Sequence, residues 1–242
     1  MIEIIPVEGL PEVGEGDDLG ALIAGAMTLE PGDVVVIAQK VVSKAEGRIV
    51  SLDAVEPSER ARELAGTQTN LWQLEVILSE TARIVRSRGG LVIAETRHGF
   101  VCASAGVDHS NAARTGEVVL LPIDPDESAR RIRTTIRDLV GVDVAVIVTD
   151  SFGRPFRQGT TDVAIGVSGI APLRDLRGTP DRAGIPLRTT QVAVADELAG
   201  AANLVRMTKA DGIPVVVVRG ARPEGDGAAT ELVIPAERDL FR

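Results

Sequence analysis

Two aspartates stand beside hydroxyl- or amide-bearing residues and are the side chains best suited to chemistry. Asp108 opens the run Asp-His-Ser-Asn that ends at Asn111, and Asp150 lies between Thr149 and Ser151. Carboxylate and hydroxyl oxygens are ligands that Mg²⁺ and Mn²⁺ prefer. Taken singly, each aspartate is more often a turn or cap residue. Asp150 follows an expected buried strand, where ligands of mixed sheets collect, so its position favours function.

Cationic side chains recur after another expected buried strand. Lys40, Lys44 and Arg48 follow one another at intervals of four residues. On a helix they would share one face. A solvated basic face and a face that binds a triphosphate or a carboxylate both fit this spacing.

A second concentration of positive charge lies in residues 151–190, which hold six arginines against three aspartates in a chain of net charge -9. This local surplus is what an anionic substrate would require. The segment Phe152 to Arg188 is polar and rich in Gly and Pro, and it is too long for an ordinary connection. We therefore expect a long functional loop there.

Several familiar devices are missing from the sequence. There is no Gly-rich phosphate loop ending in Lys-Ser or Lys-Thr, no Gly-x-Gly-x-x-Gly and no Ser-centred nucleophile elbow. His98 and His109 lack the spacing of a zinc motif, so structural hydrogen bonds or loop positions are expected for them. Cys102, among small and apolar residues, is expected to be buried in the core rather than to act as a nucleophile.

The elements that would position these residues alternate along the chain. Apolar runs predict strands and amphipathic runs predict helices, and residues 95–111 resemble a hairpin. Neither a repeat nor a linker divides the chain, so residues 1–242 are expected to form one domain. The strands are expected at residues 2–7, 34–38, 91–94, 142–149 and 214–219, and the helices at 18–26, 58–65, 71–86, 126–139 and 191–205.

Composition narrows the function classes. Hydrophobic residues make up 44% of the chain and aromatic residues 2%, which predicts an aliphatic core. The net charge of -9 and the shortage of aromatic rings argue against nucleic-acid binding. Cys102 is the lone cysteine, and no apolar run approaches the ~20 residues that cross a bilayer. We therefore expect a cytoplasmic protein with neither an export signal nor a membrane anchor.

Four segments in the same order resemble the coenzyme F420-0:L-glutamate ligase family, and the resemblance covers nearly the whole chain. The last two are long and unusual, so chance agreement is improbable. The segments are Gly-Leu-Pro-Glu-Val at 9–13, Ala-Gln-Lys-Val-Val-Ser-Lys-Ala-Glu-Gly-Arg at 38–48, Gly-Phe-Val-Cys-Ala-Ser-Ala-Gly-Val-Asp-His-Ser-Asn at 99–111, and Thr-Asp-Ser-Phe-Gly-Arg-Pro-Phe-Arg-Gln-Gly at 149–159.

The resemblance implies an α+β fold of mixed sheets with packed helices, assembled as an intertwined homodimer. It also implies that the chain has only the ligase part, without the reductase-like domain to which some relatives are fused. The implied substrates are GTP, L-glutamate and the deazaflavin F420-0, with F420-1 as a further acceptor. The implied cofactor is Mg²⁺ or Mn²⁺, with K⁺ as an additional candidate.

Site residues are carried over position by position. The resemblance implies that Asp108, Asp150 and Ser151 hold the metal, and that Asp108, Asp150 and Lys44 serve catalysis. Gln39 stands where a relative has a small hydroxyl residue, and Ser151 stands where Thr occurs. Both substitutions keep a side-chain oxygen that can act as a ligand. Residues 207–214 are also expected near the nucleotide. The implied nucleotide contacts are Leu10, Pro11, Glu12, Val13, Gln39, Lys44 and Asn111.

Three other interpretations stay open at this point. The chain could act as a ligase on another phosphorylated acid, or as a non-catalytic module that binds a nucleotide or a deazaflavin. A third interpretation makes the Arg-rich segment a dimer interface and the aspartates turn residues. Product mass separates the first from the expected reaction, and metal-dependent nucleotide consumption separates the second.

Overall fold

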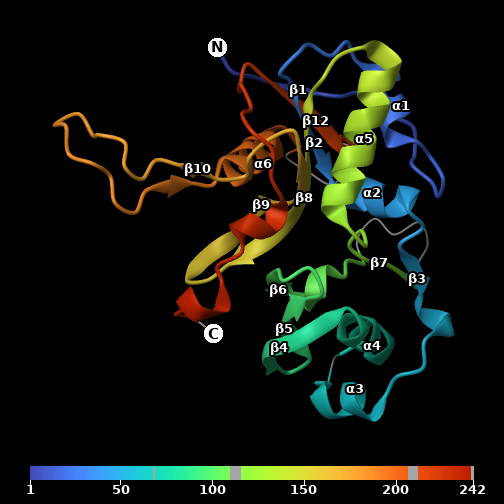
Figure 1. Cartoon of the computed structure of the whole chain (residues 1–242). Coiled ribbons are helices and arrows are strands. Elements are labelled where there is room, and N and C mark those ends of the chain that lie inside the picture. Colours follow the sequence, from blue (N-terminus) through green and yellow to red (C-terminus); the bar gives the residue numbers. More distant parts are fainter. Residues whose placement is uncertain (68, 110–115, 207–211, 241–242) are drawn as a thin grey trace.

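A five-stranded mixed sheet forms the centre of the protein (Figure 1). The computed structural model describes residues 1–67, 69–109, 116–206 and 212–240. The central strand β2 runs parallel to its neighbour β8, and every other neighbouring pair is antiparallel. In spatial order the strands are β1 (Glu3–Pro6), β12 (Val215–Arg219), β2 (Val34–Ala38), β8 (Ala145–Arg154) and β9 (Arg157–Ser168).

Helices cover both faces of this sheet. One face packs against α5 (Pro125–Val140), which also contacts α1 (Leu19–Ala26), and the other packs against α6 (Val194–Arg206) (Figure 1). A strand that is buried on both faces has a continuous apolar sequence, because neither face is exposed to solvent. Val34 to Ile37 and Val215 to Val218 are accordingly fully buried.

Local signals fix the ends of the longest helix. The Asp124 side chain caps the first turn of α5 by accepting a hydrogen bond from the backbone N–H of Glu127 at 2.9 Å. Pro125 follows at the first helical position, where its missing N–H costs nothing. Gly141 ends the helix in the left-handed conformation, with φ of 70°.

A smaller layer lies beside the main body and carries its own apolar cluster, which includes Leu74 and Ile77. It consists of the sheet β4 (Thr81–Arg88), β5 (Leu91–Thr96) and β6 (Val101–Ala103), packed with α3 (Glu59–Leu64) and α4 (Leu71–Ser79). A ribbon of β3 (Ile49–Ser51) and β7 (Glu117–Val119) connects it to the main body (Figure 1). Short 3₁₀ turns lie at Leu52–Ala54, Ser104–Gly106, Ala229–Leu232 and Ala236–Arg238.

The helix expected at residues 71–86 is too long. Helix α4 ends at Ser79, and Thr81 opens strand β4 instead. Gly89 and Gly90 both have positive φ and form the turn into β5, so they close a hairpin rather than end a helix. The β-branched pair Ile84 and Val85 favours the strand, although its spacing also fits a helix.

The prediction of a long loop from Phe152 to Arg188 is wrong for the first half of this segment. Strand β8 continues through Asp150 to Arg154, and β9 returns from Arg157, so this half is a hairpin. The second half forms an arm in which β10 (Arg174–Asp175) pairs with β11 (Gln191–Val192). Between them the chain extends away from the body, shown in orange in Figure 1.

The expected basic face is also corrected. Helix α2 (Gln39–Ala45) carries Lys40 and Lys44, but it ends before Arg48. Gly47, with φ of 66°, turns the chain, and Arg48 lies beyond the helix and pairs with Glu80.

The α+β class with mixed sheets is confirmed. The single domain and the homodimer stay predictions. No helix in the described parts of the chain is both long and apolar enough to cross a membrane.

Candidate functional site

The parallel strands β2 and β8 bring two expected site segments to one edge of the sheet. Ala38, the last residue of β2, is in register with Thr149 of β8. Gln39 and Lys40 therefore begin α2 beside the position where Asp150 follows Thr149. Carboxyl ends of parallel strands are where ligands of such sheets collect.

Asp108 reaches the same edge from the loop after β6. Its backbone N–H donates to the carbonyl of Val119 at 3.0 Å and its carbonyl accepts from the N–H of Val119 at 2.8 Å, which fixes the loop. The Asp108 side chain forms a salt bridge with Lys40, whose Nζ lies 2.7 Å from Asp108 Oδ2. An ammonium group therefore already lies at a carboxylate for which the sequence predicts a metal.

Asp150 carries the most perturbed carboxyl group of this edge. Burial, together with the charges of Asp108 and Asp162, raises the pKa of Asp150 to about 7, although the backbone N–H of Ser151 and the Lys40 ammonium oppose this shift. A carboxylate that other carboxylates disfavour is one that an added cation would stabilise.

The donor set fits a hard divalent cation that keeps part of its water. Asp108 and Asp150 offer two carboxylates, and within the residues that the structure describes no three His, Cys, Asp or Glu side chains gather closely enough to form a complete metal cage. Mg²⁺ is commonly held by one or two carboxylates, with water and substrate phosphates completing its shell.

Ser151 belongs to the other face of the strand. Side chains alternate along a strand. Ser151 is in register with Asp162 of β9, and its Oγ donates to Asp162 Oδ1 at 2.6 Å. Asp162 in turn accepts from Arg206 at the end of α6. The three expected metal ligands therefore lie at one edge, but on two faces.

Cys102 and His98 have the structural roles expected from the sequence. Cys102 is buried on β6, and desolvation together with the charge of Asp150 raises the pKa of its thiol to about 12. A thiol that stays protonated at neutral pH is a poor nucleophile. His98 Nε2 lies 2.9 Å from the carbonyl oxygen of Pro122, so the ring makes the structural hydrogen bond expected of it.

The residues expected at the nucleotide divide into two groups. Lys44 is largely buried, and its Nζ donates to Glu12 Oε1 at 2.5 Å, which joins the 9–13 segment to α2. Gln39 is 1% exposed, and its Oε1 accepts from Ser43. The Gln39 Nε2 is buried and has no hydrogen-bond partner in the described part of the chain.

Three other expected contacts are less direct. Val13 is 5% exposed and packs in the main core, so only its backbone could meet a ligand. Leu10 packs partly against the same core, while Pro11 is exposed. Asn111 and most of 207–214 lie outside the described residues.

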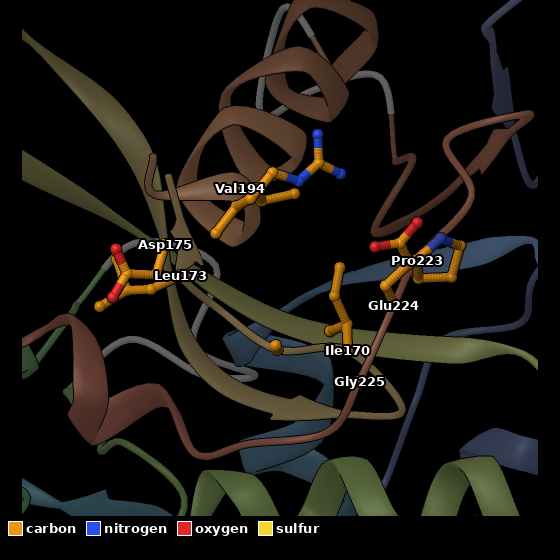
Figure 2. Close-up of a pocket in the computed structure, with 9 residues that line it drawn as sticks. Ile170, Leu173, Asp175, Val194, Pro223, Glu224 and Gly225 are labelled. Carbon is orange, nitrogen blue, oxygen red and sulfur yellow. The ribbon is translucent and has the colours of Figure 1, made fainter. Parts of the chain in front are cut away.

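Two cavities lie away from the acidic edge. One, of 340 Å³, lies beyond the end of β9 at Ser168. It is lined by Ile170, Leu173, Asp175, Val194 and Glu224 among others (Figure 2). The other, of 690 Å³, lies between α1, α2 and α5. Neither includes Asp108 or Asp150. The chemistry of the acidic edge defines the candidate site, because neither cavity gathers the expected ligands.

Comparison with known proteins matches this arrangement of segments. The profile of the F420-0:Gamma-glutamyl ligase family matches residues 9–220. The chain belongs to this family. Relatives named coenzyme F420:L-glutamate ligase match along nearly their whole length. The protein of Methanopyrus kandleri is 49% identical over 247 residues, covering 100% of this chain and 97% of the relative. That of Methanothermobacter thermautotrophicus is 45% identical over 252 residues, covering 100% and 99%.

Membership of the F420-0:Gamma-glutamyl ligase family makes the chain a ligase. Sequence reasoning singled out Asp108, Asp150 and Lys44, and the structure brings Asp108 and Asp150 to one edge of the sheet. Their roles stay predictions. Lys40, Asp162 and Arg206 were not assigned to the site. Lys40 was visible only as part of a basic repeat. Asp162 was one of three aspartates among the six arginines of 151–190 and was not distinguished from the others. Arg206 gave no signal, because a basic residue in the last turn of a helix is ordinary.

Proposed function

We propose that the chain adds γ-linked L-glutamate to coenzyme F420-0, and to F420-1 as a second acceptor. The observation that carries the proposal is the full-length similarity of 45% to 49% to relatives named coenzyme F420:L-glutamate ligase. The acidic edge, where Asp108 and Asp150 meet the cationic helix α2, supplies the site for it.

Amide formation in water needs a leaving group, and GTP is the proposed source. The terminal carboxylate of F420-0 attacks the γ-phosphorus of GTP, and GDP leaves. The amine of glutamate then attacks the acyl carbon, the C–N bond forms, inorganic phosphate leaves with the C–O electron pair, and the amine loses a proton. No covalent bond to the protein is required, so positioning and electrostatics carry the catalysis.

Each cluster of the site has a task in this reaction. Asp108 and Asp150 would hold Mg²⁺ or Mn²⁺, which neutralises charge on the phosphate oxygens during transfer. Lys44 would contact the phosphates as a point charge once it parts from Glu12. The Gln39 Nε2 is a hydrogen-bond donor for the nucleotide. The exposed Arg174, Arg177 and Arg182 are suited to carboxylates or to a phosphodiester.

The arm between β10 and β11 supports the proposed homodimer. It extends from the body (Figure 1) and exposes the apolar side chain of Ile185, which is 63% accessible. A second copy is the proposed partner that buries it. Sedimentation of the wild type and of a variant with Ile185→Asp tests this: a dimer that the substitution weakens supports the proposal, and a monomeric wild type contradicts it.

The deciding experiment mixes the purified protein with GTP, Mg²⁺ or Mn²⁺, L-glutamate and F420-0. Product mass and released GDP are measured together. A gain of one or more glutamyl units that requires both metal and nucleotide supports the proposal. GDP release without a change in the mass of F420-0 would indicate another acid as substrate. Binding of the deazaflavin without nucleotide consumption would favour a non-catalytic module.

A further inference from the structure

Arg154, the last residue of β8, is partly buried without an acidic partner. Its Nη2 donates to the carbonyl of Gln158 at 2.8 Å, which holds the side chain across the turn into β9. No carboxylate pairs with Arg154 within the residues that the structure describes. Its guanidinium therefore has a fixed position but lacks a neighbouring negative charge.

This lack of a partner distinguishes Arg154 from the other arginines that are partly or fully buried in the described ranges. Each of those forms an ion pair with a carboxylate. The pairs are Arg48 with Glu80, Arg133 with Asp143, Arg206 with Asp162 and Arg219 with Asp33. Covering a charge from water is unfavourable unless an opposite charge compensates for it. An anionic ligand would supply the compensation that Arg154 lacks.

Part of the Arg154 guanidinium can still reach a ligand. Its Nε is enclosed and has no hydrogen-bond partner among the described residues, so it cannot meet a ligand from solvent. Nη1 is not among the enclosed atoms, and Nη2 uses one of its two N–H groups on Gln158. Nη1 and the second N–H group of Nη2 can together donate to two oxygens of one phosphate or carboxylate.

Arg154 lies on the same face of β8 as Asp150. Side chains alternate along a strand, so Asp150, Phe152 and Arg154 point the same way. The exposure along β8 agrees, because these three residues are partly covered while the two residues between them are exposed. The ring of Phe152 meets that of Phe100, which precedes β6, edge to face with centres 6.4 Å apart. A row of carboxylate, aromatic ring and guanidinium therefore follows the end of β8 where the smaller layer meets it.

We propose that Arg154 binds the phosphodiester of the acceptor F420-0. This inference rests on the proposed function and narrows it, because it assigns one group of the acceptor to one residue. The other described arginines of 151–190 offer a less fixed guanidinium, or one that is already paired. Arg157, Arg174, Arg182 and Arg188 are exposed, and Arg177 pairs with Asp175.

The side of β8 on which Arg154 lies favours the acceptor over the nucleotide. Strands β2 and β9 flank β8 from opposite sides. The expected nucleotide residues Gln39 and Lys44 follow β2, whereas Arg154 lies in the hairpin with β9. In phosphoryl transfer the attacking and leaving oxygens lie roughly in line across the phosphorus. The acceptor therefore approaches the γ-phosphate from the side away from GDP, which is the side of the hairpin.

The length of the row also fits an acceptor that starts at Asp150. Four residues of a strand span about 13 Å. A metal–oxygen contact of about 2 Å and an attack distance of about 3 Å take up only part of this length. The rest leaves room for the γ-phosphate and for the acceptor atoms between its carboxylate and its phosphodiester.

Equilibrium dialysis of F420-0 tests the contact directly. GDP and Mn²⁺ are present, so no reaction can occur, and the absorbance of the deazaflavin gives the bound fraction. Arg154→Gln should weaken F420-0 binding by about 10- to 100-fold, because a charge-assisted contact is lost. Arg154→Lys keeps the charge without the planar fork and should show a smaller loss. Unchanged binding in Arg154→Gln would overturn the inference.

Arg130→Gln is the matched control, since it also removes one guanidinium but from an exposed pair with Glu127 on α5. Its affinity for F420-0 should equal that of the wild type. An equal loss in Arg130→Gln and Arg154→Gln would mean that only the net charge matters, which contradicts a specific contact.

Steady-state kinetics show which anion Arg154 holds. In Arg154→Gln the KM for F420-0 should rise by about 10- to 100-fold, while the KM values for GTP and for glutamate stay within about threefold. A rise confined to the KM for glutamate would assign Arg154 to a glutamate carboxylate, and a rise confined to the KM for GTP would assign it to the nucleotide. Either result would overturn the proposal.

The hydrogen bond to Gln158 also gives Arg154 a structural role, which thermal melts separate from binding. If Arg154→Gln lowers the melting temperature and raises all three KM values together, and Arg154→Lys restores none of them, the residue serves only the fold and the inference fails. If the wild type neither binds F420-0 nor forms product, the proposed function itself fails, and this is seen without any variant.

Discussion

Lys40 and Asp108 form an ion pair of 2.7 Å at the edge of the sheet where a metal ion is proposed. The ammonium also lies close enough to Asp150 to favour its ionised form. A lysine and a divalent cation cannot share one carboxylate without repulsion. Metal binding at Asp108 therefore has to displace or share this contact, and Lys40 sets part of the affinity.

Replacing Lys40 with Gln should tighten Mn²⁺ binding by roughly several-fold at low salt, because a competing positive charge is removed within a few ångströms of the site. Isothermal titration of the substrate-free protein measures the change. Arg60→Gln is the matched control, since it also removes one charge but from an exposed pair with Glu63 on α3. Weaker binding in the Lys40 variant would mean that the lysine supports the site instead of competing for it.

Asp150→Asn should lower turnover at least about 100-fold and leave the fold intact, because the amide keeps the volume but loses the charge that the cation needs. Product mass at several metal concentrations gives the rate, and circular dichroism checks the fold. Near-normal turnover at limiting metal would show that Asp150 is not a ligand.

Two glycine substitutions should change stability in opposite directions. A Cβ on Gly166 would lie 2.3 Å from the backbone oxygen of Pro125, so Gly166→Ala forces β9 away from α5 and should cost about 1–3 kcal/mol. A Cβ on Gly25 meets nothing within 4 Å, and the residue lies in α1 without a positive φ, so Gly25→Ala should gain about 0.5–1 kcal/mol. Urea denaturation of both variants compares them, and equal effects would contradict this packing of β9 against α5.

Asp126 should give stability a measurable pH dependence. Burial raises the pKa of Asp126, although its carboxylate accepts from the backbone N–H of Val167 at 2.7 Å and of Ala229. A carboxyl group with a raised pKa binds its proton more tightly in the folded chain, so its contribution is present at low pH and is lost as pH rises through the folded pKa.

Asp126→Asn keeps an oxygen acceptor and cannot ionise. The stability of this variant relative to the wild type should therefore increase from about pH 4 to about pH 7. Thermal melts at both pH values measure the difference. A pH-independent difference would show that Asp126 has the same pKa in both states.

Sequence patterns identified the elements that are buried on both faces. The runs at Val34 and Val215 and the capped helix at Pro125 were found because composition and end signals agree there. The segment after Leu71 was misassigned, because its apolar spacing fits a helix and Gly89-Gly90 fits both a helix end and a hairpin turn. Only pairing with β5, a contact distant in sequence, decides between them.

The site was predictable in part for the same reason. Asp108 and Asp150 are recognisable because oxygen-bearing residues surround them in the sequence. Asp150 and Ser151 lie on opposite faces of β8 because side chains alternate along a strand. This was not predicted, because the strand was expected to end at Thr149. The partnership of Asp162 with Arg206 joins β9 to α6 and leaves no local pattern.

The aliphatic composition has a practical consequence for following the unfolding of this protein. The chain has one tryptophan and no tyrosine, so its intrinsic fluorescence comes from Trp72 on α4. Helix α4 belongs to the smaller apolar cluster rather than to the main one. Fluorescence therefore reports the smaller layer, while far-ultraviolet circular dichroism reports the whole backbone. Coinciding transitions would indicate one cooperative unit, and separate transitions would resolve the two layers without any added label.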